Sequence, residues 1–446
     1  MGQFQGKTVA FCTFGCKLNQ TESAMLAAEF RARGWEIEKE ERADLIVVNT
    51  CAVTARSESK VRQAIRHLAR TNPRAAIAVV GCATQLHPDA YRTLPNVRWV
   101  LGVNSKFRLT EILGQVECIT VDDEQREFVS PSAGFFWSRT RGFLKIQDGC
   151  RFRCSYCAVP LARGRSRSAD PSLVLEQACA LAERGHKEIV LTGVDIGSYG
   201  IDLRPRRSLA WLLRRLVDQL PQVRFRLSSV EPTEVTDELL ETVSGLGQVC
   251  RHFHIPLQSG SDRILRQMHR PYTAGFYRQK IERLVSMMGE LGLGSDVIVG
   301  FPGESEQDFS ATTGLVHELP FTYLHVFPFS PRPGTAAARY PDDVPRRVKE
   351  ARSELVRQMA AAKKEAFLAG QVGKTEIVLV EARREGGMLV GLTDKYVKVC
   401  FQGEDGLVNR FVRVKITRAA GGFLWGEPED GSAPGALGKR AEASES

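Results

Sequence analysis

Short apolar runs alternate with helical patterns over the N-terminal part of the chain. The runs KTVAFCTFG, ADLIVVNTC and AAIAVVGC are rich in Val and Ile, and each ends at a Gly, Thr or Cys. The segments between them, residues 19–34 and 57–72, place apolar residues at helical spacing. Alternating strands and helices predict a parallel sheet with right-handed crossovers. We therefore expect an α/β domain over residues 1–116.

The same alternation returns in the central part of the chain. The apolar runs GFLKIQ, EIVLTGV, RFRLSS, RHFHIPL, SDVIVGF and YLHVFPF are separated by helical patterns. Six β/α units favour a partial (β/α)6 barrel of the TIM type over a second small sheet. We predict this barrel, with a long charged connecting helix at its end, over residues 140–368, after a linker at 117–139. His252 and His254 alternate on one strand and are expected inside the barrel, with no third type of metal ligand beside them.

After Gly370 the helical signal ends, and short strands follow that are broken by Gly-rich turns. This pattern predicts a small all-β barrel over residues 371–430, in the size class of OB-like modules that bind nucleic acid. Nine basic and nine acidic residues stand between Val372 and Asp430, so charge by itself does not indicate RNA binding here. The polar, Gly-, Ala- and Ser-rich end, residues 431–446, is expected to be disordered.

The composition is that of an ordinary globular protein. The chain has 446 residues, 43% hydrophobic and 25% charged, and no run approaches the ~18 apolar residues of a membrane span. The N-terminus lacks the basic region and apolar length of a signal peptide, so we expect a cytoplasmic protein without a membrane partner. The net charge of +9 weakly favours a polyanionic partner. Because cytosolic thiols stay reduced, clustered members of the eleven cysteines indicate metal ligation or catalysis.

Cys150, Cys154 and Cys157 form a CxxxCxxC motif just after a predicted strand. Zinc sites usually take four ligands, a thioredoxin-like CxxC needs no third cysteine, and a bacterial ferredoxin run has four. Three thiolates on a four-iron cluster leave one iron without a protein ligand, where a small molecule can bind. The alternative, three chance core cysteines, fits poorly with the polar residues between them.

Three further cysteines each follow one of the N-terminal strands: Cys16 in FGCKLNQ, Cys51 in VVNTCAV and Cys82 in VVGCATQ. The carboxyl ends of parallel strands open on one edge of a sheet, where ligand sites form. Cysteines far apart in the sequence are therefore expected to meet. Three unrelated core thiols are the alternative, since buried cysteine is common. The repeated order of strand, small residue and cysteine favours a second three-cysteine cluster.

The stretch CRFRCSYC, including Tyr156 before its last cysteine, resembles the radical S-adenosylmethionine signature. The resemblance implies a [4Fe–4S] cluster on Cys150, Cys154 and Cys157, with an open iron that binds the amino and carboxylate groups of S-adenosylmethionine. It also implies reductive cleavage of that cofactor to a 5′-deoxyadenosyl radical. The implied fold is a partial barrel with the cluster at its C-terminal mouth.

Nearly the whole chain resembles the radical S-adenosylmethionine methylthiotransferase family. The matching parts are the N-terminal domain, the motifs LTGVDIGSYG, LSSVEP, HIPLQSGSD and DVIVGFPGE, and a C-terminal RNA-binding barrel of the TRAM type. The resemblance implies that Cys16, Cys51 and Cys82 hold an auxiliary [4Fe–4S] cluster whose free site carries the sulfur to be donated. Arg151 departs from the family pattern, which has an acidic or amide residue there, and makes the loop more basic.

Within the family, FGCKLNQ and HVFPFSPRPGT look most like the branch that methylthiolates N6-threonylcarbamoyladenosine next to the tRNA anticodon. Related branches act on isopentenyladenosine in tRNA or on an aspartate of a ribosomal protein. A basic ribosomal substrate fits the basic balance of this chain less well. A non-catalytic iron–sulfur RNA-binding protein is the remaining alternative, but it would not need two ligand-free irons.

The resemblance also implies cofactors and partners: two [4Fe–4S] clusters, S-adenosylmethionine, a tRNA anticodon stem-loop, and an electron donor such as flavodoxin or ferredoxin. The small or polar residues placed to touch S-adenosylmethionine are Gly193, Val194, Asp195, Ser229, Glu231, Gln258 and Asp296. Each could instead be a turn residue or a helix cap. Gly300 and Glu304 fit a turn on the adenine side. The arginines expected to hold the tRNA, unless they form a merely solvated basic loop, are Arg151, Arg153, Arg163, Arg165 and Arg167.

Overall fold

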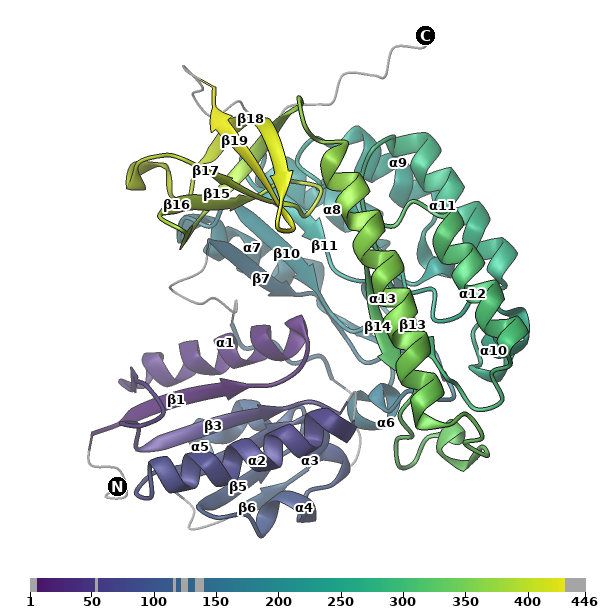
Figure 1. Cartoon of the computed structure of the whole chain (residues 1–446). Coiled ribbons are helices and arrows are strands. Elements are labelled where there is room, and N and C mark those ends of the chain that lie inside the picture. Colours follow the sequence, from purple (N-terminus) through teal and green to yellow (C-terminus); the bar gives the residue numbers. More distant parts are fainter. Residues whose placement is uncertain (1–5, 53–54, 115–117, 122–126, 133–139, 430–446) are drawn as a thin grey trace.

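The computed structural model describes residues 6–52, 55–114, 118–121, 127–132 and 140–429, which form an N-terminal sheet, a central barrel and a small C-terminal barrel (Figure 1). This arrangement confirms the fold class expected from the sequence. The expected disordered tail and most of the expected linker lie outside the described residues. Within the described part, every helix is too short or too polar to span a lipid bilayer.

The N-terminal sheet has six strands in the order β2-β1-β3-β4-β5-β6, and every neighbouring pair is parallel. Its strands are β1 (Thr8–Thr13), β2 (Glu36–Ile37), β3 (Leu45–Thr50), β4 (Ala76–Gly81), β5 (Val97–Leu101) and β6 (Cys118–Thr120). Its helices are α1 (Lys17–Ala32), α2 (Ala55–Thr71), α3 (Cys82–Leu86), α4 (Asp89–Arg92), the 3-10 helix η1 (Ser105–Arg108) and α5 (Leu109–Ile112). The three predicted strands are confirmed as β1, β3 and β4, and three further strands extend the sheet.

Helices cover both faces of this sheet. Ile46 and Val48 of β3 belong to an apolar core shared with α2, whereas Leu45 and Val47 belong to one shared with α1. A strand that is buried on both faces needs apolar residues at every position. This burial explains why β3 and β4 appear in the sequence as continuous apolar runs.

The central barrel contains all six predicted strands: β7 (Arg141–Lys145), β10 (Glu188–Thr192), β11 (Arg224–Leu227), β12 (His252–His254), β13 (Gly292–Val299) and β14 (Tyr323–Pro328). They pair in parallel as β11-β10-β7 and β12-β13-β14. The bridges Phe225–Val249 and Ser229–His254 join the two halves. Among the described residues β7 and β14 do not pair, so the barrel is open on that side.

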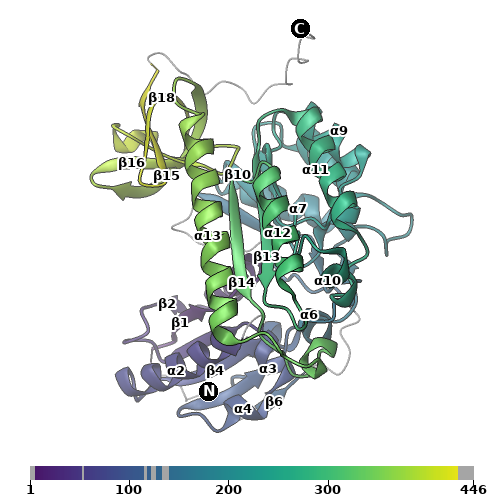
Figure 2. The same ribbon diagram turned by 45° about the vertical axis from the view of Figure 1, so that its right-hand side comes forward.

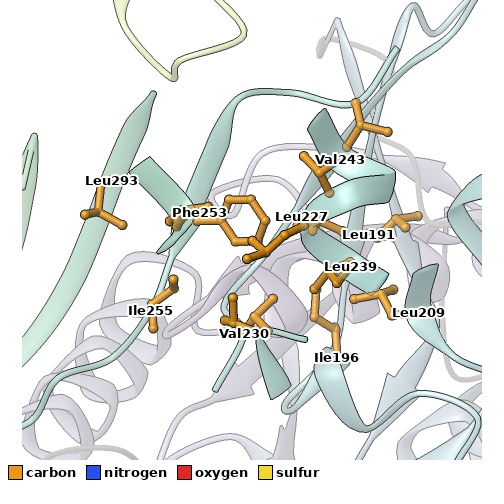
Figure 3. Packing of buried hydrophobic residues seen from close by; sticks show 14 of the residues in the cluster. Leu191, Ile196, Leu209, Leu227, Val230, Leu239, Val243, Phe253, Ile255 and Leu293 are labelled. Carbon is orange, nitrogen blue, oxygen red and sulfur yellow. The ribbon is translucent and has the colours of Figure 1, made fainter. Parts of the chain in front are cut away.

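The outer helices of the barrel are α7 (Pro171–Glu183), α8 (Leu209–Gln219), α9 (Asp237–Gly245), α11 (Ala274–Met288), α12 (Glu306–Glu318) and α13 (Arg346–Ala369), with the shorter α6 (Val159–Arg163) and α10 (Asp262–Gln267). Most begin at a side chain that accepts a hydrogen bond from the first turn, as Ser208 does for α8. Leu191 and Leu227 of the strands pack with Leu209 and Leu239 of the helices in one continuous apolar core (Figure 3).

The C-terminal barrel is closed in the order β15-β16-β17-β19-β18. Its strands are β15 (Thr375–Glu385), β16 (Met388–Leu392), β17 (Lys398–Phe401), β18 (Phe411–Ala420) and β19 (Phe423–Pro428). The charged helix α13 runs beside β14 and leads to this barrel, as the sequence predicted for a connecting helix (Figure 2).

The turn between β16 and β17 covers the N-terminal end of the central barrel. Arg226 donates to the carbonyl oxygens of Thr393 and Asp394, each at 2.8 Å. Arg224 and Arg226 both form ion pairs with Glu188, the first residue of β10. The C-terminal barrel therefore closes the end where the central strands begin and leaves their carboxyl ends available for a site.

Candidate active site

The loop that carries the CxxxCxxC motif lies between β8 (Gln147–Asp148) and α6. Gly149 has a φ of +70°, and a Cβ there would lie 2.0 Å from the carbonyl oxygen of Arg165, so this turn requires glycine. The backbone N–H of Ser155 donates to the carbonyl oxygen of Met268 at 3.0 Å, and its hydroxyl donates to that of Gln267 at 2.7 Å. The loop is thus fixed to the C-terminal end of α10.

All three motif cysteines are free, half-buried thiols. Burial, and then the carboxylate of Asp195 with Oδ2 3.9 Å from Sγ, raises the pKa of Cys150. Burial and the neighbouring Cys154 raise the pKa of Cys157 to about 12. Cysteine binds metal as thiolate, so loading of this site must release protons.

One sulfur of the motif contacts a buried arginine. Arg270 Nη1 donates to Cys154 Sγ at 3.1 Å, and Arg270 is held by an ion pair with Glu231. The sequence prediction included Glu231 but missed Arg270. Arg270 lies in the HRPYT stretch that follows the HIPLQSGSD motif, and this position in the sequence could have indicated a residue of the site.

The residues expected to touch S-adenosylmethionine lie around the same loop. Val194 and Asp195 follow β10, and their backbone N–H groups donate to Gln147 Oε1 at 3.0 and 2.8 Å. Ser229 follows β11, and Gln258 N donates to the carbonyl oxygen of Asp296 at 2.8 Å. Asp296 lies within β13, and the other expected residues follow the carboxyl ends of β10, β11 and β12: Gly193, Val194, Asp195, Ser229, Glu231 and Gln258.

Asp195 is buried, and its Oδ1 accepts no hydrogen bond among the described residues. Its neighbour Glu234 is a carboxyl group whose pKa is raised to about 10 by burial and then by Asp195. The protonated Glu234 carboxyl can donate its O–H to Asp195, and the remaining lone pairs of the Asp195 carboxylate can accept from a donor on a bound molecule. Gly300 and Glu304 contact one another: Gly300 N donates to Glu304 Oε2 at 2.7 Å, and Arg352 pairs with the same carboxylate.

The three N-terminal cysteines stand where three adjacent strands end. Cys16 precedes α1, Cys51 follows β3, and Cys82 opens α3 directly after β4. Gly15, with a φ of +103°, lies so close to Cys51 that a Cβ there would be 2.8 Å from its Sγ. Asn19 Nδ2 donates to the carbonyl oxygen of Phe14, just after β1, and to that of Thr50, the last residue of β3, each at 2.8 Å. The predicted convergence of these cysteines on one sheet edge is what the geometry shows.

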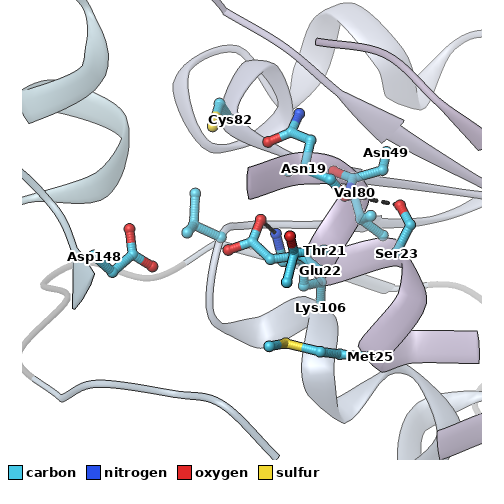
Figure 4. Close-up of polar contacts among 12 residues, drawn as sticks. Asn19, Thr21, Glu22, Ser23, Met25, Asn49, Val80, Cys82, Lys106 and Asp148 are labelled. Atoms are coloured by element: carbon cyan, nitrogen blue, oxygen red, sulfur yellow. Dashed lines mark hydrogen bonds and ion pairs between the residues drawn. The ribbon is translucent and has the colours of Figure 1, made fainter. Parts of the chain in front are cut away.

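A buried charge cluster joins the two cysteine sets. Arg163 on α6 donates from Nε to Cys82 Sγ at 3.1 Å and pairs with both Glu22 and Asp148. Figure 4 shows Glu22 with its ion-pair partner Lys106, and Asp148 facing them from the central barrel. Burial raises the pKa of the Cys82 thiol, although Arg163 and Lys106 oppose this shift.

This cluster corrects part of the expected tRNA surface. Arg163 and Arg167 are buried, and Arg167 donates to the backbone carbonyl oxygens of Arg163 and Arg165. Neither guanidinium group can reach a phosphate, because both are buried and form contacts inside the protein. Arg151, Arg153 and Arg165 are exposed and line a cavity of about 400 Å³.

A second cavity, of about 190 Å³, lies between the two cysteine sets. Its walls include Cys157 and Gln258 from the central barrel and Ala52, the neighbour of Cys51, from the N-terminal sheet. Tyr156, Asp296 and Phe327 complete part of the lining. One bound group in this cavity would be near both sets of thiols.

The barrel interior beneath this cavity is polar. His252 Nε2 and His254 Nδ1 lie 2.9 and 3.1 Å from the hydroxyl of Tyr323, as expected for hydrogen-bond partners inside the barrel. The expectation of no third ligand type beside them is wrong, because His254, Asp296 and His325 lie close enough to share an ion. His254 Nε2 is 3.0 Å from Asp296 Oδ1, so these two side chains contact each other directly.

Known proteins share this architecture. Family models match at residues 8–102 (Uncharacterized protein family UPF0004), 144–316 (Radical SAM superfamily) and 370–428 (TRAM domain). The fold resembles the radical S-adenosylmethionine methyltransferase TsrM from Kitasatospora setae, with a TM-score of 0.55 and 15% identity over 72% of this chain and 73% of that chain. The open barrel with its CxxxCxxC loop is therefore that of a radical S-adenosylmethionine enzyme.

Proteins similar in sequence indicate which family of radical S-adenosylmethionine enzymes the chain resembles. The chain is 38% identical to Threonylcarbamoyladenosine tRNA methylthiotransferase MtaB of Bacillus subtilis, over 92% of this chain and 94% of that protein. It is 37% identical to the Thermotoga maritima protein of that name, with the same two coverages. It is 36% identical to tRNA-2-methylthio-N(6)-dimethylallyladenosine synthase of Moorella thermoacetica, over 95% and 99%. The chain belongs to the radical S-adenosylmethionine methylthiotransferase family.

The donor sets fit iron–sulfur clusters. Each set offers three free cysteines, which is the ligand type that such clusters take. Near Cys82, the cations Lys106, Lys145 and Arg163 face only two carboxylates, Glu22 and Asp148, within this buried group of side chains. Buried charge is normally compensated, and a thiolate-bound cluster beside Cys82 would supply the missing negative charge.

Proposed function

We propose that this protein methylthiolates carbon 2 of N6-threonylcarbamoyladenosine in tRNA. Support for the substrate comes from the relatives of that name in Bacillus subtilis and Thermotoga maritima. The observation that carries the proposal is the cavity bounded by Cys157 on one side and by the neighbour of Cys51 on the other. An adenine base there would face both cysteine sets at once.

The two sets would each hold a [4Fe–4S] cluster: Cys150, Cys154 and Cys157 in the central barrel, and Cys16, Cys51 and Cys82 in the N-terminal domain. Together with S-adenosylmethionine, these groups supply the methyl group, the sulfur and the radical that removes the hydrogen from carbon 2. Such chemistry lies outside the reach of side-chain acids and bases, so the chain positions its cofactors. A reduced flavodoxin or ferredoxin would provide the electrons.

The chain's own residues would orient S-adenosylmethionine at the motif loop. Asp195 would accept a hydrogen bond from its amino group, since this buried carboxylate lies beside the motif loop, with Oδ2 3.9 Å from Cys150 Sγ. Gln258 and Asp296 line the cavity and would contact its nucleoside. Gly193 and Val194 would contact S-adenosylmethionine through their backbone atoms, and Ser229 and Glu231 would lie beside the cofactor.

The tRNA would be held on the face around the motif loop. Arg151, Arg153 and Arg165 are exposed together beside one cavity, which suits phosphate contacts. Phe327 is an exposed aromatic residue on the wall of the central cavity, and unstacked RNA bases bind to such rings. The C-terminal barrel would add further RNA contacts. We propose domain boundaries at residues 1–116, 140–368 and 371–430.

The test is nucleoside mass spectrometry of tRNA from cells with and without this gene. Loss of 2-methylthio-N6-threonylcarbamoyladenosine, with accumulation of the form lacking the methylthio group, supports the proposal. Loss of the methylthio form of dimethylallyladenosine instead would assign the substrate of the Moorella relative. Unchanged tRNA contradicts both.

Complementation adds a matched control. We expect Cys82→Ala to leave the deletion strain without the methylthio nucleoside, whereas Cys179→Ala should restore it. Cys179 is also a free, partly buried cysteine, but it packs against the apolar core and belongs to neither set.

A further inference from the structure

In each cysteine set, one sulfur contacts a buried arginine side chain. Arg163 Nε lies 3.1 Å from Cys82 Sγ, and Arg270 Nη1 lies 3.1 Å from Cys154 Sγ. Both arginine side chains are only 2% exposed. Each is held by a glutamate, Glu22 in the first case and Glu231 in the second. Two unrelated segments thus place the same buried donor against one sulfur of each set.

We propose that Arg163 and Arg270 are positioning residues that raise the reduction potentials of the two clusters, each through the one ligand sulfur it contacts. This inference rests on the proposed function, because it requires that the cysteines bind clusters. Adding an electron makes a cluster more negative. A hydrogen bond to a ligand sulfur and a nearby positive charge therefore stabilise the reduced state.

Burial makes these contacts effective. A charge that is shielded from water acts through a lower dielectric than one at the surface, and salt screens it less. Exposed arginines such as Arg153 and Arg165 also stand near the motif loop, but their charges are solvated. The two buried arginines are therefore the ones expected to set the potentials.

The surroundings predict unequal effects at the two sites. Arg163, Lys106 and Lys145 together carry three positive charges against the two carboxylates of Glu22 and Asp148, so net positive charge faces Cys82. Arg270 is neutralised by Glu231 and has acidic neighbours around that carboxylate, so mainly its hydrogen bond acts on Cys154. We expect a larger shift at the N-terminal site than at the motif loop when the arginine is removed.

The experiment measures each cluster separately by redox titration followed by electron paramagnetic resonance. A background with Cys150, Cys154 and Cys157 changed to Ala isolates the N-terminal site, and the reciprocal background isolates the motif site. Into each we would place Arg163→Gln, Arg270→Gln and the control Arg224→Gln. Arg224 is also buried and paired with a glutamate, but its contacts lie at the opposite end of the barrel.

We expect Arg163→Gln to shift only the N-terminal cluster to a more negative potential, and Arg270→Gln to shift only the motif cluster, by less. Arg224→Gln should shift neither. Equal shifts at both sites, unchanged potentials or positive shifts would overturn the proposal. Iron and sulfide content, measured on the same samples, shows that the clusters compared are intact.

Lysine variants cover the case in which a glutamine variant fails to bind iron. Arg163→Lys and Arg270→Lys keep the charge but lose the fixed geometry of the guanidinium donor, so we expect smaller negative shifts. Loss of iron from both variants at one site would show that the arginine is only structural there. If the unsubstituted protein bound no cluster at either set, the proposed function itself would fail before these comparisons.

Discussion

Glu22 on α1 accepts hydrogen bonds from both Nη atoms of Arg163 on α6, at 2.9 and 2.8 Å, inside the protein. The two residues are 141 positions apart, and the pair joins the N-terminal sheet to the helix that follows the motif loop. Lys106 and Lys145 complete the environment of the same carboxylate. This contact therefore links the N-terminal cysteine set to the helix beside the motif loop.

Glu22→Gln should destabilise the protein by about 3–5 kcal/mol, because the substitution leaves buried cations without their carboxylate. Glu29→Gln on the same helix is the control, since Glu29 pairs with Arg33 at the surface and such pairs contribute about 0–1 kcal/mol. Urea unfolding of identically reconstituted samples gives both values. A similar decrease in the free energy of unfolding for the two variants would mean that the buried ion pair contributes no more stability than the surface pair.

Acid should weaken the docking of the C-terminal barrel. Burial opposes ionisation of Glu290, but hydrogen bonds from Lys374, Lys395 and Gln371 lower its pKa to about 2. A carboxyl whose pKa is lower in the folded state stabilises the protein fully above its unfolded pKa of about 4.3. That contribution is lost as the pH falls from about 4.3 toward about 2.

Melting temperatures measured from pH 6 downward test this expectation. Glu290→Gln should lose less stability than the unsubstituted protein across that acid window, and should already be less stable at pH 6. Glu385→Gln, which removes an exposed partner of Arg383, should keep the original pH dependence. Equal pH dependence in all three proteins would exclude a role for Glu290.

Arg153→Ala and Arg165→Ala should each weaken tRNA binding and reduce the dependence of the logarithm of affinity on that of salt concentration by about 1. The reason is that each exposed guanidinium would release one counterion from a phosphate. Arg278→Ala is the matched control, because Arg278 pairs with Glu318 on the outer helices. Filter binding at several salt concentrations measures the slopes. An unchanged slope for both variants would place the RNA elsewhere.

Phe327→Ala should raise the KM for tRNA by about 5- to 150-fold, because base stacking on an aromatic ring contributes about 1–3 kcal/mol. Phe327 is 37% exposed on the cavity wall. Leu355→Ala removes an exposed apolar side chain from α13 and should leave KM unchanged. Steady-state methylthiolation assays compare the two, and an unaltered KM for Phe327→Ala would show that the base does not stack there.

Much of the fold could be read from local patterns. Apolar runs and helical spacing gave β1, β3, β4 and all six central strands, because secondary structure follows side-chain periodicity. The strands β2, β5 and β6 were not among the predicted strands. The grouping of the cysteines into two sets could also be predicted from the sequence. Parallel strands end at one edge of a sheet, and the spacing of the CxxxCxxC motif is local.

The sequence by itself therefore determined the elements, their parallel topology and the two cysteine sets. Only the tertiary structure decided which charged side chains face inward. Arg163 and Arg165 stand two positions apart in one basic stretch, yet the first is buried against Glu22 and the second is exposed. Whether a charged side chain is buried depends on which segments, distant in sequence, pack against it. The order of charges along the chain does not specify that packing.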